Sequence, residues 1–140
     1  MGFEQVYMIW DYWDGPRSGI AMYAGQPHFY RCEWDEAAHD YGDTFILVPI
    51  DQETFSLAKE QWSIWRQWEA AFHNGEVAAS THPGLEGSNP RYAELQRDIE
   101  GRLDLQPRDR DRKRATFRVQ PGQESQTPGI MRELEVEWWD

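Results

Sequence analysis

Short runs of apolar and polar positions alternate over the first fifty residues of the chain. Four of these runs, residues 6–13, 20–23, 28–34 and 44–50, are rich in aromatic and β-branched side chains, which is typical of strands. The segments between the first three runs contain Asp, Gly and Pro, which favour turns. Because short connections favour antiparallel neighbours, we predict an antiparallel meander of four strands.

The next segment, residues 51–74, has the periodicity of a long amphipathic helix. Asp51 is a good N-cap, and the pair Asn74 and Gly75 is a typical C-terminal stop. Between them apolar side chains recur at steps of three and four residues: Phe55, Ala58, Trp62, Trp65 and Phe72. We therefore predict one helix of about six turns with a broad, Trp-rich apolar face.

A second helix and a final hairpin are predicted from the rest of the chain. The pair Asn89 and Pro90 favours a helix start, and a narrow apolar stripe follows it: Tyr92, Leu95, Ile99 and Leu103. Residues 115–119 and 130–138 alternate apolar with polar positions, as strands do. Residues 75–88 are rich in small side chains, and residues 106–114 are polar apart from one Pro, so both segments are predicted to be exposed loops.

These elements predict an α+β protein that forms a single domain over residues 1–140. The expected order is β-β-β-β-α-α-β-β, with the strands in an antiparallel sheet and the long Trp-rich helix packed on one face of it. A chain of 140 residues fits one domain, and no internal repeat is present.

The net charge of the chain indicates which kinds of molecule it can bind. The chain has 25 Asp and Glu against 14 Lys and Arg, a formal net charge of −11 at pH 7. Such a charge repels nucleic acid phosphates and anionic membrane surfaces, and it attracts basic proteins or cations. We therefore predict a basic protein partner and expect neither nucleic acid nor a membrane. The charge does not indicate an oligomeric state.

The cysteine content and the N-terminal residues favour the cytoplasm. The one cysteine, Cys32, cannot form a disulfide within the chain, which suits a reducing compartment. The first residues lack the basic start and apolar run of a signal peptide. The longest apolar stretch, residues 45–48, is far shorter than a membrane span. We expect a cytoplasmic protein.

Acidic side chains are concentrated between residues 33 and 53, where neither Lys nor Arg occurs. The carboxylates in this segment are Glu33, Asp35, Glu36, Asp40, Asp43, Asp51 and Glu53. Such oxygens, with a nearby His, are ligands that divalent cations accept. The segment has no HExxH, EF-hand or CxxC spacing, however. We favour a solvated acidic loop over residues 35–43, without a metal.

The first turn holds a second group of charged side chains. Asp11, Asp14 and Arg17 surround it, so a hairpin would bring them to one end of the sheet. Two carboxylates with an arginine can perform acid–base chemistry if burial shifts one pKa. They can equally shape the turn, with Arg17 in a surface ion pair of small net energy. The structural interpretation is the one that the sequence favours.

Other candidate groups give weaker signals. Cys32 alternates with aromatic neighbours in a strand, which favours a buried and inert thiol, and no GxSxG, P-loop or GxGxxG motif occurs. The basic run within residues 108–114 is interrupted by aspartates, so we interpret it as a solvated linker. Trp138 and Trp139 are adjacent in a strand and point to opposite faces, which makes Trp139 a candidate exposed anchor.

Two hypotheses for function follow. The first is a binding or interaction module, comparable to small inhibitor or immunity proteins, that uses its acidic side chains against a basic partner. The second is a small metal-dependent hydrolase or ligand-binding protein that uses the turn at Asp11, Asp14 and Arg17 with carboxylates from residues 33–53. Because no catalytic motif occurs, the sequence favours the binding role and predicts no cofactor.

Overall fold

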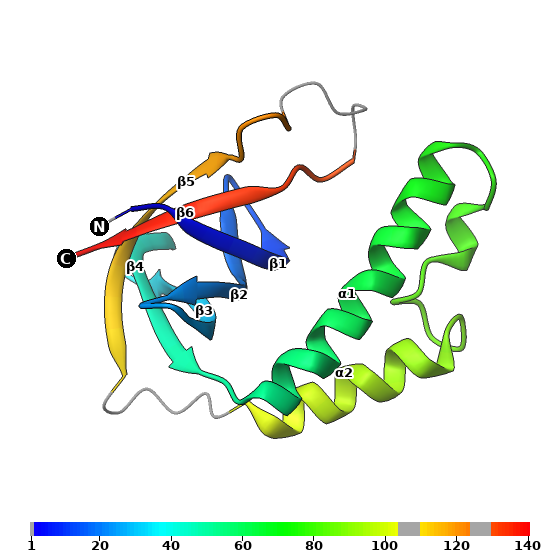
Figure 1. Ribbon diagram of the computed structural model, residues 1–140, viewed down its shortest axis with the longest axis horizontal. Coiled ribbons are helices and arrows are strands. Elements are labelled where there is room, and N and C mark those ends of the chain that lie inside the picture. The colour runs from blue at the N-terminus through cyan, green and yellow to red at the C-terminus, as the bar shows by residue number, and fades with distance from the viewer. Residues whose placement is uncertain (1, 104–109, 124–129) are drawn as a thin grey trace. The chain divides into compact units, whose positions relative to one another are not determined.

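The computed structural model describes residues 2–103, 110–123 and 130–140, which divide into two compact units (Figure 1). The barrel unit holds the described residues of Met1–Ile50, Asp104–Glu124 and Arg132–Asp140. The helical unit holds those of Asp51–Leu103 and Ser125–Met131.

The barrel unit is a closed, six-stranded antiparallel barrel in which each strand pairs with the next along the chain. Its strands are β1 (Glu4–Tyr12), β2 (Pro16–Tyr23), β3 (Gln26–Asp35), β4 (Asp40–Pro49), β5 (Asp111–Val119) and β6 (Leu134–Trp139). Strand β6 also pairs with β1, with Val136 opposite Glu4, and this pairing closes the barrel. Each of the six described strands is therefore paired on both sides over part of its length.

Four aromatic rings pack inside the barrel. Every pair among Tyr30, Phe45, Phe117 and Trp138 has ring centroids between 5.7 and 6.1 Å apart. These tilted and edge-to-face arrangements are the ones that aromatic pairs prefer. Burial raises the pKa of Tyr30, and its protonated hydroxyl donates to the Met8 carbonyl oxygen over 3.2 Å.

Glycine at position 19 of β2 allows the Met8 carbonyl oxygen and the Tyr30 hydroxyl to lie close to its backbone. Gly19 lies opposite Ile9 and Tyr30 in the neighbouring strands. A Cβ atom at Gly19 would lie 2.0 Å from the Met8 carbonyl oxygen and 2.9 Å from the Tyr30 hydroxyl. No side chain fits there, so the wall of the barrel requires glycine at this position.

The helical unit consists of α1 (Gln52–His73), the short 3₁₀ helix η1 (Ala79–Thr81) and α2 (Pro90–Arg102). The predicted N-caps are confirmed: Asp51 accepts from the Thr54 amide over 2.8 Å, and Asn89 accepts from the Tyr92 amide over 2.9 Å. These hydrogen bonds satisfy amides that a helix start leaves without partners.

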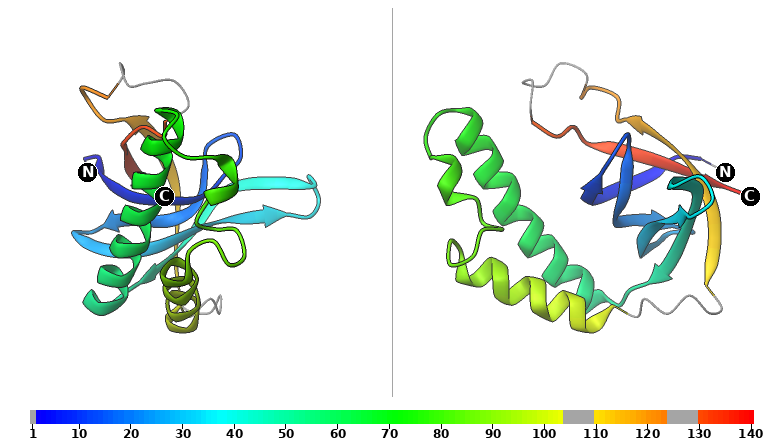
Figure 2. Two further views of the ribbon diagram at one scale, coloured as in Figure 1. Left: turned by 90° about the vertical axis from the view of Figure 1, so that its right-hand side faces the viewer. Right: turned by 180° about the vertical axis from the view of Figure 1, so that it is seen from behind.

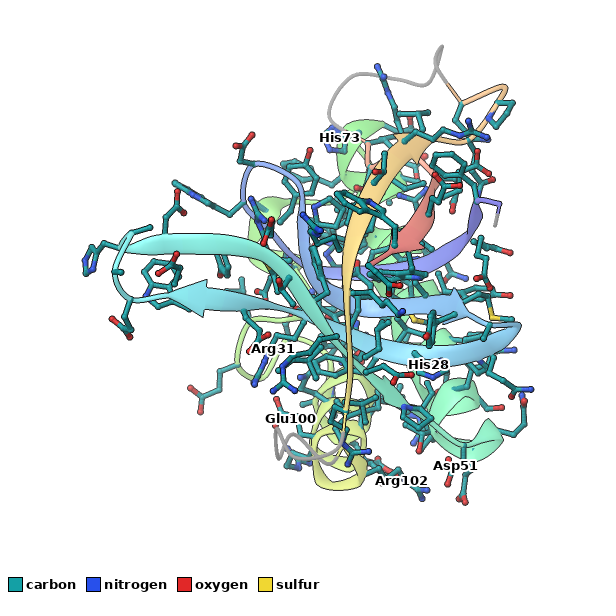
Figure 3. All side chains as sticks on the ribbon, turned by 90° about the vertical axis from the view of Figure 1, so that its left-hand side faces the viewer. His28, Arg31, Asp51, His73, Glu100 and Arg102 are labelled. Atoms are coloured by element: carbon teal, nitrogen blue, oxygen red, sulfur yellow. The ribbon has the colours of Figure 1, made fainter. Side chains whose placement is uncertain are left out.

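Polar side chains link α1 to α2. The Arg91 guanidinium donates two hydrogen bonds to the Glu60 carboxylate, over 2.6 and 2.7 Å. The side-chain amide of the buried Gln61 donates to the side-chain oxygen of Gln96. Arg102 reaches Glu53 over 3.0 Å. In Figure 3, Arg102 lies beside Asp51 at the end of the unit where α1 begins.

A buried carboxylate holds the connection that precedes β6 against α1. Glu69 accepts from the Met131 amide over 2.9 Å, while Arg66 donates to the Met131 carbonyl oxygen over 2.7 Å. Arg66 and Glu69 also pair with each other at 2.7 Å. Side chains from a single turn of α1 therefore hydrogen-bond both the amide and the carbonyl group of Met131.

The predicted fold, an antiparallel sheet with the long helix packed on one face, is wrong. The strands close into a barrel, and the helices form a compact unit of their own. The order of elements along the chain is the predicted one. Periodicity does not encode which strands pair, so it does not reveal that the last strand returns to the first.

Two predicted loops also differ in detail. Residues 111–114, predicted to belong to an exposed loop, form the start of β5 and pair with β4. Residues 106–109 lie outside the described residues. Within residues 75–88 the structure has one short helix, η1, and otherwise turns and bends.

Candidate functional site

Strands β3 and β4 form a long hairpin whose tip extends beyond the neighbouring strands (Figures 2 and 3). They stay paired as far as Asp35 and Asp40, so the predicted acidic loop is reduced to a turn over residues 36–39. The Asp35 carboxylate accepts from the amides of Ala37 and Ala38, at 3.0 and 3.2 Å, and thereby shapes this turn.

Two carboxylates of the hairpin pair with arginines of β5. Glu33 lies 3.1 Å from Arg112, and Asp43 lies 3.9 Å from Arg114. The basic run that we interpreted from the sequence as a solvated linker is therefore partly the neighbouring strand of the acidic hairpin. All four side chains are substantially exposed, so the pairs contribute little to stability but reduce the local negative charge.

Trp139 lies beside this row of ion pairs. The Arg114 guanidinium lies over its ring, 4.3 Å from the centroid, and its indole nitrogen donates to the Thr116 hydroxyl over 3.1 Å. The side chain is exposed on the outside of the barrel, whereas Trp138 points into the core. The opposite orientations of the two tryptophans are as predicted.

Arg17 joins the turn between β1 and β2 to the β3–β4 hairpin. Its guanidinium donates to the Trp13 carbonyl oxygen over 2.7 Å and to the Asp14 carbonyl oxygen over 3.1 Å. It also donates to the Cys32 Sγ over 3.5 Å and lies 4.9 Å from the centre of the Tyr41 ring. One side chain therefore contacts both hairpins.

The other two residues of the predicted turn site have separate surroundings. Asp11 accepts from the Ser18 hydroxyl over 2.7 Å. Asp14 has a φ of 53° in the turn itself, and within the described residues its carboxylate makes neither a hydrogen bond nor an ion pair. Asp11 and Asp14 share no contact that would make them a carboxylate pair.

We call residues 11–17 and 33–43 together the rim surface. It contains every side chain selected from the sequence except Trp139: Asp11, Asp14, Arg17, Glu33, Asp35, Glu36, Asp40 and Asp43. Three hollows open on it within the described ranges. One, of about 420 Å³, is lined by Asp11, Arg17, Arg31 and Glu33. A second, of about 440 Å³, lies along the β3–β4 hairpin and is lined by Glu33, Trp34, Asp35, Glu36 and Asp43. The smaller hollow, of about 250 Å³, is lined by the β1–β2 turn, Asp43, Phe45 of β4, and Ala115 and Phe117 of β5.

The rim surface also exposes large aromatic side chains that the sequence reasoning missed. Tyr12, Trp13 and Trp34 have exposed fractions of 62%, 68% and 48%. The pattern of residues 6–13 predicts a well-buried strand, but β1 is irregular between Ile9 and Tyr12, so its alternation is lost before the turn. A further irregularity separates Cys32 from Trp34. The sequence does place Tyr12 and Trp13 immediately before the turn at residues 14–15, where a strand leaves the core, and this position could have indicated their exposure.

The thiol of Cys32, next to the rim surface, is not activated as a nucleophile. Burial raises the pKa of the Cys32 thiol, which disfavours the thiolate, although the Arg17 guanidinium opposes this. The thiol donates to the Gly42 carbonyl oxygen over 3.3 Å. Among the residues that the structure describes, no group of three or more His, Cys, Asp or Glu side chains is arranged to hold a metal ion.

Two findings concern the chain as a whole. No helix within the described ranges has both the length and the apolar character needed to cross a membrane. Comparison with models of known protein families, with curated proteins and with solved structures finds no match.

Proposed function

We propose that the protein is a non-catalytic binding module, of the inhibitor or immunity type, whose rim surface docks a basic protein. The observation that carries this proposal is the exposure of Tyr12, Trp13 and Trp34 among carboxylates on two hairpins that Arg17 holds together. Aromatic anchors surrounded by charged groups are typical of protein–protein interfaces.

The aromatic side chains supply the affinity in this proposal. Single exposed apolar residues are normal on protein surfaces, but here three large exposed rings lie on two hairpins that Arg17 connects. Docking that removes on the order of 100 Å² of each ring from water contributes about 2–3 kcal/mol per ring before the costs of association. The rings on the hairpin are also held in place: Trp34 packs against Tyr41, with centroids 5.2 Å apart.

The carboxylates supply the preference for a basic partner. Within the described residues, the side chains of Asp14 and Glu36 make no hydrogen bond or ion pair. Asp35 and Asp40 accept only from backbone amides of their own hairpin. Their charges face solvent, and on a chain of net charge −11 they would attract a basic protein and accelerate its association.

The groups that a hydrolase would use are engaged elsewhere. Asp11 is bonded to Ser18, and Arg17 is bonded to backbone carbonyl oxygens. No specific observation favours the metal-dependent alternative, so binding is the function that we take forward. We also propose the cytoplasm as the place of action, because the thiol of Cys32 is buried and the chain has no second cysteine.

The proposal is tested by capture of partners from source-cell lysate with three forms of the protein. These are the wild type, the double variant Trp13→Ala/Trp34→Ala, and Leu85→Ala, which removes an exposed apolar side chain from the helical unit. We expect the wild type and Leu85→Ala to retain one basic protein in stoichiometric amount, less tightly as salt rises, and the double variant to lose it. Retention of the same proteins by all three forms, or capture of nucleic acid alone, would contradict the proposal.

A further inference from the structure

We infer that the smaller hollow of the rim surface receives one basic side chain of the partner, an aliphatic stem that ends in a cation. This inference rests on the proposed function and names the group that the rim surface recognises. The hollow has a volume of about 250 Å³, which is large enough for a single side chain of this kind.

The floor of the hollow is apolar. It is formed by Phe45, Ala115 and Phe117, and the rings of Phe45 and Phe117 are part of the aromatic core, with centroids 5.7 Å apart. The small side chain of Ala115 leaves space between strand and turn. Methylene groups of a lysine or arginine stem would be removed from water there, which favours their burial.

The edge of the hollow carries two carboxylates. The Asp14 carboxylate has no hydrogen bond or ion pair within the described residues. Asp43 has a long ion pair with Arg114, at 3.9 Å, and a long hydrogen bond from the Thr44 hydroxyl, at 3.3 Å. Both carboxylates can therefore accept from an incoming cation without breaking a short bond. A cation between two carboxylates above an aromatic floor is stabilised by both groups.

Arg17 also lines the hollow, where the two carboxylates outnumber its single positive charge. Its three nitrogens donate to the carbonyl oxygens of Trp13 and Asp14 and to the Cys32 thiol. These bonds fix the turn, in which Asp14 and Gly15 both have positive φ, 53° and 114°. The Asp14 carboxylate is thus carried by a backbone that is ordered before any ligand arrives, which lowers the entropic cost of binding.

The hollow of about 420 Å³ does not favour a cation. Its lining combines two carboxylates, Asp11 and Glu33, with two guanidinium groups, Arg17 and Arg31. Glu33 is paired with Arg112 and Asp11 with Ser18. The exposed Arg31, labelled in Figure 3, has no hydrogen bond or ion pair within the described residues. A cation would meet equal numbers of like and opposite charges there.

The hollow of about 440 Å³ has four carboxylates in its lining, but Glu33 is paired with Arg112, Asp35 accepts from two amides, and none of its lining residues belongs to the buried core. We assign the basic side chain to the smaller hollow because only this one combines available carboxylates with an aromatic floor.

Nuclear magnetic resonance titration tests this assignment with small probes. Butylammonium and butylguanidinium represent the lysine and arginine side chains, and butanol is the neutral control. At physiological salt we expect both cations, but not butanol, to give saturable shifts of the amides of residues 14–17, 42–45 and 115–117. The relative affinities of the two cations show which side chain the hollow prefers.

Matched variants make the test specific. Asp14→Asn/Asp43→Asn removes both charges with almost no change of shape, and Asn tolerates the positive φ at position 14. We expect it to weaken both cations at least tenfold. Glu36→Gln removes one rim charge outside the hollow and should bind them like the wild type. Ala115→Leu fills the floor and should abolish binding; its amide spectrum reports directly whether it folds.

The inference is overturned if the cations give no saturable shifts, if butanol gives equal ones, or if Glu36→Gln weakens binding as much as Asp14→Asn/Asp43→Asn does. Its failure is distinct from that of the proposed function. A basic partner that needs Trp13 and Trp34 but binds Asp14→Asn/Asp43→Asn normally would contradict the hollow alone. Cation binding in the hollow without any captured partner would contradict the proposed function alone.

Discussion

The rim surface of the barrel and the helical unit both carry many carboxylates and aromatic rings, but the two regions use them differently. In the helical unit Glu53, Glu60, Glu94 and Asp98 each pair with Arg91 or Arg102. The rings there also have partners, since Trp62 stacks on Trp65 and Trp68 stacks on Phe72, each at 5.0 Å.

On the rim surface some carboxylates and aromatic rings remain exposed and available to bind another molecule. The carboxylates of Asp14 and Glu36 have no hydrogen bond or ion pair within the described residues, and Trp13 is the most exposed of the large apolar side chains described. The difference teaches that net charge alone is a poor guide to function. Carboxylates paired inside one unit hold helices together, whereas carboxylates beside exposed rings on ordered hairpins are available to another molecule.

The largest expected effect is on the free energy of unfolding, and it is seen by making the same change, glycine to alanine, in each of the two regions. Gly19→Ala places a Cβ atom 2.0 Å from the Met8 carbonyl oxygen in the barrel wall. We expect a loss of about 3 kcal/mol or more in the free energy of unfolding, or no folded protein at all. Gly101→Ala in α2 meets no atom within 4 Å and should stabilise the helix by roughly 0.5–1 kcal/mol. Urea denaturation measures both, and equal effects would mean that the barrel wall is not tightly packed.

The next effect concerns the exposed rings. Trp13→Ala/Trp34→Ala should weaken partner binding by about 100-fold, or roughly 2.7 kcal/mol, because two anchors lose their contact area. The melting temperature should stay close to that of the wild type, since Trp13 and Trp34 are both exposed. Leu85→Ala in the helical unit is the control. A large drop in melting temperature with the double variant would instead give these rings a structural role.

A smaller effect is expected from the unpaired charges. Asp14→Asn/Glu36→Gln should slow association several-fold at low salt and much less at high salt, because it reduces electrostatic attraction rather than contact area. Glu60→Gln removes one charge from a paired group in the helical unit and should leave association nearly unchanged. Stopped-flow kinetics at two salt concentrations separates the two cases. The same slowing by Glu60→Gln would mean that only total charge matters.

The smallest expected effect is a dependence of the melting temperature on pH, caused by carboxylates that are hydrogen-bonded in the helical unit. The Thr54 hydrogen bond holds the pKa of Asp51 below its usual value, and Arg91 does the same for Glu60. A carboxyl whose pKa is lowered by folding stabilises the protein above its unfolded-state pKa, near 4, and this contribution is lost as the pH falls through the folded-state pKa. The melting temperature should therefore fall as the pH is lowered below about 4.

The variant Asp51→Asn/Glu60→Gln checks this assignment. Asparagine is also a good N-cap, so the helix start is kept while the titrating groups are removed. Its melting temperature should depend less steeply on pH than that of the wild type over the same range. An unchanged dependence would show that other carboxylates cause the acid sensitivity.

Local features of the fold could be predicted from the sequence, and long-range pairing could not. The helix starts at Asp51 and Asn89 were predictable because an N-cap bonds an amide only three residues away. Barrel closure depends on Val136 returning to Glu4, a pairing that leaves no periodic signal. The residues before Ala115 in β5 are mainly arginine and aspartate, so the apolar pattern does not mark where that strand begins.

The same distinction applies to the candidate site. The turn at Asp14 could be predicted from turn-forming residues, whereas the predicted acidic loop over residues 35–43 is strand again from Asp40 onward. That Arg17 would contact both hairpins, and that Arg112 and Arg114 would face Glu33 and Asp43, depends on strand register across the barrel. The exposure of Trp13 was missed because a strand pattern gives no indication of where a strand leaves the core.

Photo-crosslinking in source cells tests the central claim most directly. A photoreactive phenylalanine analogue replaces Trp13 on the rim surface in one form of the protein and Leu85 in the helical unit in the other. The account predicts one discrete adduct with a basic protein from position 13 and none with that protein from position 85. The same adduct from both positions, or an adduct from position 85 alone, would contradict it.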